Sequence, residues 1–149
     1  MRDRVALRAL LAAVAIGISF AIVELFVTGV LAARAIPHWY ISFLKAHKYV
    51  GLELWSIAEM QVPIALLAAG LGVVLARLVK NSSISPPLVA LGAWLLCRLL
   101  LPGFYGVPLG ESLRDQVSGF AYFPMSMTAE IVLPCLALIL GFRWIAQRR

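Results

Sequence analysis

The stretch Ala129-Glu130-Ile131-Val132-Leu133-Pro134 places a carboxylate and a proline inside an apolar segment near the C-terminus. The same pattern of residues occurs once before in the chain, and each copy continues to a glycine and an arginine. The distance in sequence between matching residues is the same for every match. The matching positions are Ala58, Glu59, Pro63, Gly70 and Arg77 in the first copy, and Ala129, Glu130, Pro134, Gly141 and Arg148 in the second. Matches of this kind at a single register predict two copies of a two-helix unit, one at about residues 5–80 and one at about 86–149.

The composition predicts an all-α membrane protein. Of 149 residues, 62% are apolar and only 13% are charged, which is far from the usual composition of a soluble globule. A helix needs about 20 mostly apolar residues to cross a bilayer, and segments 6–33, 54–78, 88–107 and 125–145 meet this requirement. They leave little chain for a soluble domain. We therefore expect residues 1–149 to form a single transmembrane domain, a four-helix bundle made of two repeated helical hairpins.

The basic residues indicate the orientation of this bundle. The net charge of +6 is not gathered on one soluble face, so the sequence does not predict nucleic-acid binding. The positive charges instead lie at the ends of the spans. The larger group comprises Arg2, Arg4, Arg8, Arg77, Lys80, Arg143, Arg148 and Arg149, and the smaller group comprises Arg34, Lys45, Lys48 and Arg114. Because basic residues are enriched on the cytoplasmic side, we expect a protein of the cell inner membrane with both termini in the cytoplasm.

The two outer connections have features of short amphipathic helices. Segment 37–50 interleaves aromatic residues with lysines, and 108–117 mirrors it, which is typical of helices that lie in the membrane interface. No metal site or cofactor is predicted, because His38 and His47 lack a third ligand at a suitable spacing. Cys97 and Cys135 form no Cys-x-x-Cys pair and are interpreted as small buried hydrophobes.

Each predicted span contains one deep ionisable residue, namely Glu24, Glu59, Arg98 or Glu130. Three of them are followed four positions later by a proline, and these prolines are Pro63, Pro102 and Pro134. A proline at this position removes the helical hydrogen bond to the preceding carbonyl, so a helix break is expected beside each charge. Counting at about 1.5 Å per residue puts all four charges roughly 8–13 Å below the outer ends of the spans. An unpaired charge there costs at least about 2.5 kcal/mol, so the four groups are expected to face inward as one layer.

Three carboxylates against one guanidinium leave an excess of negative charge. A low-dielectric layer resists this excess, which predicts that at least one glutamate is protonated or that a cation is bound. The favoured interpretation is a ligand or proton site, made by the four charged residues, that binds a proton, a cation or a small cationic solute in transport or permeation.

Three alternatives stay open at this stage. The charges could serve only to lock the helices in register. The chain could be a non-catalytic subunit, immunity protein or assembly partner that works in the lipid bilayer as a homo-oligomer or within a larger membrane complex. It could also be an enzyme that acts on a lipid or isoprenoid at the outer leaflet, with Glu59 or Glu130 as acid or base. The enzyme hypothesis is disfavoured because the sequence has no recognisable nucleophile, metal triad or phosphate loop, so no catalytic residue is assigned.

Overall fold

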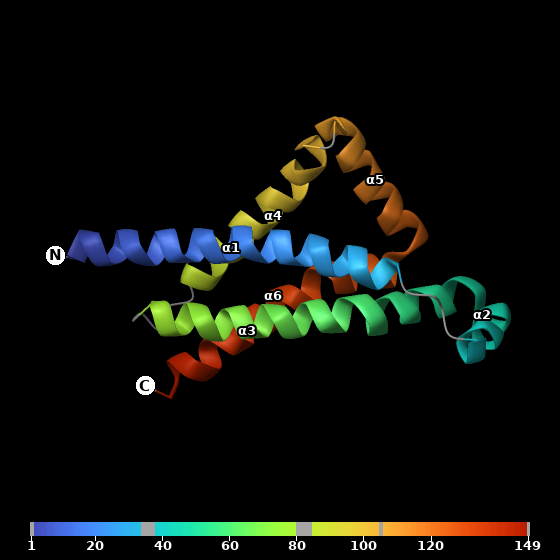
Figure 1. Cartoon of the computed structure of the whole chain (residues 1–149), viewed down its shortest axis with the longest axis horizontal. Helices are drawn as coiled ribbons and strands as arrows, with labels where there is room; N and C mark the ends of the chain where they lie inside the picture. The colour runs from blue at the N-terminus through green and yellow to red at the C-terminus, as the bar shows by residue number, and fades with distance from the viewer. Residues whose placement is uncertain (1, 34–37, 80–84, 105, 149) are drawn as a thin grey trace.

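The computed structural model describes residues 2–33, 38–79, 85–104 and 106–148, and nearly all of them are helical. In chain order the elements are α1 (Arg2–Ala32), α2 (His38–Ser56), the π-helical turn η1 (Ile57–Gln61), α3 (Val62–Leu78), α4 (Ser85–Phe104), α5 (Leu109–Tyr122) and α6 (Pro124–Ala146) (Figure 1). Pro37, Arg34, Lys80 and Arg149 of the sequence patterns lie outside the described residues.

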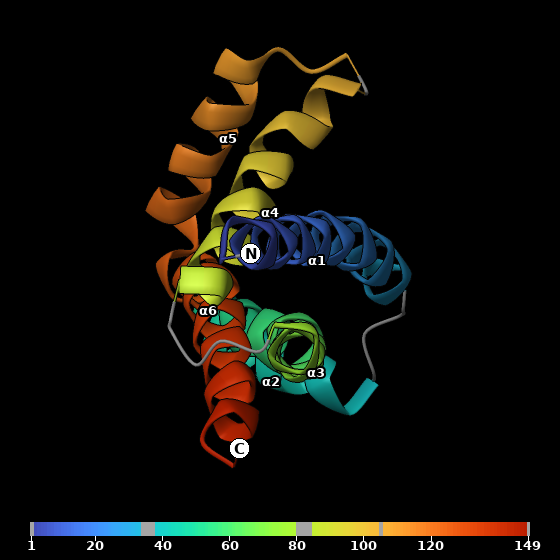
Figure 2. The same ribbon diagram turned by 90° about the vertical axis from the view of Figure 1, so that its left-hand side faces the viewer.

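Four helical segments are long and apolar enough to cross a membrane, which confirms the predicted all-α membrane class. They are Val5–Leu31, Tyr40–Leu78, Ser85–Gly103 and Pro124–Ala146. The first and third segments run in one general direction and the second and fourth return, so that the two ends of the chain lie at the same end of the molecule (Figures 1 and 2).

The second segment begins earlier than the predicted span 54–78. Helix α2 already starts at His38 and breaks at Lys48, where φ is 43° and ψ is −117°, a backbone conformation that is rare for a residue with a side chain. Across this break the Tyr40 hydroxyl donates a hydrogen bond of 2.5 Å to the carbonyl of Gly51, and the Tyr40 ring lies 4.5 Å from that of Trp55. The first part of α2 therefore folds back on the second part of the same helix, which contains Gly51 and Trp55.

Pro63 shapes the middle of that segment. A proline ring clashes with the carbonyl four residues earlier and cannot donate a hydrogen bond to it, and here that carbonyl belongs to Glu59. The chain forms the wider turn η1 at this point, in which the N–H of Val62 bonds to the carbonyl of Ile57. Pro102 and Pro134, in contrast, lie inside α4 and α6, which continue beyond them.

The connection between α4 and α6 also differs in its bounds from the prediction. Helix α4 ends at Phe104 rather than at residue 107, and α5 covers Leu109–Tyr122 rather than 108–117. From the far end of α4, α5 runs back to the start of α6 (Figure 1).

The spanning helices pack in two main pairs, α1 with α4 and α3 with α6. Glycine permits the close approach in both, because a Cβ on Gly17 would collide with the Ala90 carbonyl oxygen and a Cβ on Gly141 with that of Ala69. The buried cluster between the helices includes Phe20, Ala21, Ile64, Ala68, Leu91, Trp94 and Leu138. This packing fixes α1 against α4 at the level where their charged residues face each other.

Candidate functional site

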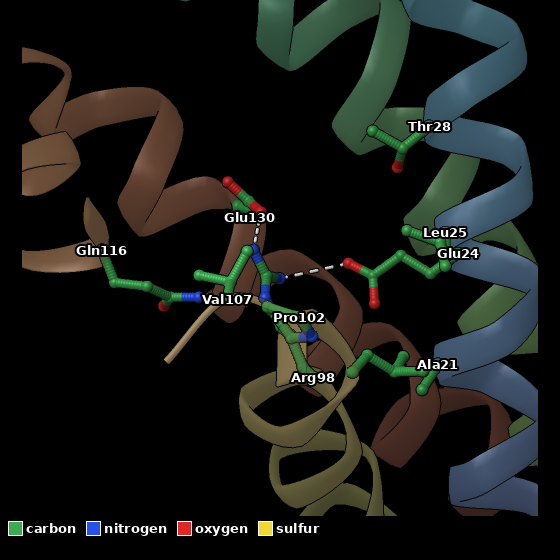
Figure 3. A pocket seen from close by; sticks show the side chains of 10 residues that line it. Ala21, Glu24, Leu25, Thr28, Arg98, Pro102, Val107, Gln116 and Glu130 are labelled. Atoms are coloured by element: carbon green, nitrogen blue, oxygen red, sulfur yellow. Dashed lines mark hydrogen bonds and ion pairs between the residues drawn. The ribbon is translucent and has the colours of Figure 1, made fainter. Parts of the chain in front are cut away.

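Arg98 of α4 lies between two carboxylates from different helices. Its Nη1 is 3.1 Å from Oε1 of Glu24 on α1, and its Nη2 contacts Oε1 of Glu130 on α6 (Figure 3). We refer to Glu24, Arg98 and Glu130 as the charged triad. The guanidinium thus joins three spanning helices, because its forked terminal nitrogens reach one acceptor on each side.

Trp94 binds the second oxygen of the Glu24 carboxylate. It precedes Arg98 by one helical turn on α4, which puts both side chains on the same face. The Trp94 indole Nε1 donates to Oε2 of Glu24 at 2.5 Å, and its ring stacks 5.2 Å from that of Phe20. The Arg98 guanidinium carbon also lies 5.9 Å from the centroid of the indole ring. Both Glu24 oxygens are therefore fixed by donors from α4.

The triad is largely shielded. The side chains of Glu24, Arg98 and Glu130 are 9%, 18% and 23% exposed. Charges in such surroundings interact strongly but lose hydration, so a pair is tolerated only when its members are well matched. With both carboxylates ionised the triad carries one net negative charge.

A cavity of about 380 Å³ adjoins the triad. Besides the triad it is lined by two polar residues, Thr28 and Gln116, and by the apolar residues Ala21, Leu25, Leu101, Pro102 and Val107. The lining comes from α1, α4, the segment after α4, α5 and α6, and Figure 3 shows Gln116 extending from α5 toward Arg98. The arrangement combines three charged groups from three helices with five apolar residues.

The structure brings together three of the four charged residues that the sequence singled out. Glu59 lies in η1, partly buried, and has no ion pair with any residue of the described part of the chain. Of the three prolines only Pro102 lines the cavity. No group of three or more potential metal ligands occurs among residues 2–33, 38–79, 85–104 and 106–148.

Two polar residues near the bundle interior were missed at the sequence level. Trp94 could have been found, since it lies one turn from Arg98. Glu53 could not, because its partners are far away in sequence: its Oε2 accepts hydrogen bonds from the backbone N–H groups of Met125 at 2.5 Å and Ser126 at 2.9 Å. A carboxylate from α2 thereby satisfies free N–H groups in the first turn of α6.

The fold and site together define a class: an all-α protein whose described residues include four segments long and apolar enough to cross a membrane, with a carboxylate–guanidinium triad beside a cavity. No protein family model, curated protein or solved structure matches the chain.

Proposed function

We propose that this protein is a small integral membrane protein whose charged triad binds a proton, a cation or a small cationic solute in transport or permeation. The observation that carries the proposal is the position of two carboxylates and one guanidinium in the lining of a cavity that is bordered by residues of α1, α4, α5 and α6. Ionisable residues that face a cavity between membrane-spanning helices commonly mark ion or proton pathways. Uptake of one positive charge would neutralise the triad.

Flux measurements in liposomes test this function. The purified chain is reconstituted, and proton, sodium and potassium fluxes are recorded for the wild type, for a Glu24→Gln/Glu130→Gln variant and for Glu111→Gln. The last variant is a control, because it makes the same substitution at an exposed residue of α5 outside the triad and the cavity. We expect flux to fall to the level of empty liposomes in the double variant and to persist in the control. Equal fluxes in all three proteins would exclude the triad from the pathway.

A second candidate function follows from Glu59. A carboxylate in a spanning segment usually has a partner, and Glu59 has none in the described part of the chain. A homo-oligomer or a larger membrane complex would supply a cation to it from a neighbouring chain. We expect Glu59→Gln to reduce the mass of the detergent-solubilised particle to that of one chain. An unchanged particle mass would argue against this role.

We further propose that the protein resides in the cell inner membrane with both termini in the cytoplasm. Support comes from the basic residues at the shared end of the molecule, such as Arg77 and Arg148, and from both chain ends lying there (Figure 1). Helix α5 is assigned to the outer interface, since exposed Leu113 and Val117 accompany the charged Arg114 on it. In intact cells, cysteine at position 118 should react with an impermeant reagent and cysteine at position 83 should not. Labelling at position 83 but not at position 118 would contradict the proposed orientation.

We also propose that the chain consists of two repeated hairpins related by a pseudo-twofold axis along the membrane normal. Counterpart helices pack together, α1 with α4 and α3 with α6. At the repeat offset Val27 corresponds to Arg98, so the first copy has an apolar residue where the second has a guanidinium. An arginine placed at position 27 should therefore couple more strongly to Glu59 than to Glu24 in double-mutant cycles. Stronger coupling to Glu24 would contradict the repeat relation.

A further inference from the structure

We propose that the cavity beside the charged triad accepts a small amphipathic organic cation, whose charged group pairs with Glu130 while its apolar part lies against Leu25, Leu101 and Val107. This inference rests on the proposed function and specifies the ligand class of the same site.

The two carboxylates of the triad differ in their availability. Glu24 uses both oxygens, one toward Trp94 and one toward Arg98, and its side chain is 9% exposed. Glu130 has a single polar contact within the described part of the chain, the one with Arg98, and its side chain is 23% exposed. Glu130 is therefore the carboxylate with an oxygen left for a ligand, whereas Glu24 anchors the guanidinium.

The charge of the site selects a cation over an anion. Both terminal nitrogens of Arg98 already contact carboxylates, and an anion bound at its remaining N–H groups would add to the net negative charge of the triad. A cation can approach Glu130 without breaking either ion pair, and it would balance the net negative charge of the triad. An ammonium group also donates hydrogen bonds, which the second Glu130 oxygen can accept.

The remaining walls select an organic cation over a metal ion. Hard cations prefer six or more oxygen ligands, but half of the cavity-lining residues are apolar: Ala21, Leu25, Leu101, Pro102 and Val107. A cavity of about 380 Å³ is at the lower end of small-molecule sites, which are typically apolar with a few polar groups that fix orientation. Thr28 and Gln116 provide such polar groups beside the triad.

Three probes of equal chain length separate charge from hydrophobicity: hexylammonium, hexanoate and hexanol. Each is titrated into the full-length protein in lipid nanodiscs, with empty nanodiscs as the background, and binding is followed through the unfolding temperature. We expect a saturable increase with hexylammonium only. Saturable binding of hexanoate or hexanol at equal or lower concentration, or of sodium alone, would overturn the inference.

Variants connect the binding to this cavity. Glu130→Gln removes the charged acceptor and should weaken hexylammonium binding by about tenfold or more. Val107→Trp should also abolish binding, because it fills the cavity and leaves the triad intact, so it provides the test if Glu130→Gln does not fold. Glu111→Gln, an exposed change on α5, is the control and should bind like the wild type. Unaltered binding in folded Glu130→Gln or Val107→Trp protein would refute the assignment.

The liposome fluxes distinguish failure of this inference from failure of the proposed function. Triad-dependent proton, sodium or potassium flux without hexylammonium binding would leave the transport function standing and remove the organic-cation ligand. Absence of both would remove the two proposals together.

Discussion

Replacing Arg98 with leucine tests the triad most directly. Leucine fits an apolar helix, so the change removes the guanidinium without introducing a polar group. It leaves Glu24 and Glu130 without their shared counter-charge at side-chain exposures of 9% and 23%. Glu24 has little access to solvent at its position, whereas Glu130 is partly exposed.

The size of the effect follows from this burial. Removing one partner of a buried ion pair typically costs about 3–5 kcal/mol, because the remaining charge loses its compensation. We expect about 3 kcal/mol for Arg98→Leu, the lower end of the range, since Glu130 keeps some access to solvent. Glu130→Gln should cost only about 1 kcal/mol, because Arg98 retains Glu24 and the glutamine oxygen still accepts a hydrogen bond.

The assay is a double-mutant cycle on the free energy of unfolding in detergent. Adding Glu24→Gln to Arg98→Leu removes the more buried of the two stranded carboxylates and should recover about 1–2 kcal/mol. Glu59→Gln is the matched control: because Glu59 has no described contact with the triad, its effect should add to that of Arg98→Leu.

Two results would refute this reasoning. Additive losses for Arg98→Leu and Glu24→Gln, within about 0.5 kcal/mol, would mean that the two groups are energetically independent. If Glu59→Gln restored the stability of Arg98→Leu as much as Glu24→Gln does, the loss would depend on the total number of carboxylates in the bundle. It would then not depend on the geometry of the triad.

Three further predictions concern the groups that hold the site in place. Trp94→Phe keeps an aromatic ring but removes the donor to Glu24, and should lower the free energy of unfolding by about 1–3 kcal/mol, with a smaller effect once Glu24→Gln is present. Gly141→Leu should destabilise the packing of α3 against α6 by about 1–3 kcal/mol; Gly70→Leu at the counterpart position should be nearly neutral in a thermal melt, because a Cβ there meets no atom within 4 Å. Glu53→Ala should accelerate hydrogen exchange of the amides in the first turn of α6, and unchanged exchange would exclude the cap.

The residues that make up the charged triad were largely predictable from the sequence. A charge in an apolar segment is costly, so Glu24, Arg98 and Glu130 had to face inward and meet opposite charges. Which two of the three glutamates contact Arg98 was not predictable, because all three lie at similar depth by residue count. The choice depends on how the helices pack, and that packing leaves Glu59 outside the triad.

Contacts between segments that are distant in the sequence could not be predicted from the sequence. Glu53 caps α6 only because the fold brings the second half of α2 to the start of that helix. The break at Lys48 gave no local signal either, since lysine is not a residue that favours positive φ.

The sequence alone determined that the described part of the chain is helical, with four segments long and apolar enough to cross a membrane, because a long apolar run in a bilayer must bond every backbone polar group internally. It also determined which few ionisable residues would require partners. The tertiary structure decided which residues those partners are. The backbones of α1 and α4 approach closely at Gly17, and this packing lets the guanidinium of Arg98 reach carboxylates from two other helices. Residue spacing fixes depth along each helix, whereas the rotation and crossing of helices are set by packing between segments that are remote in sequence.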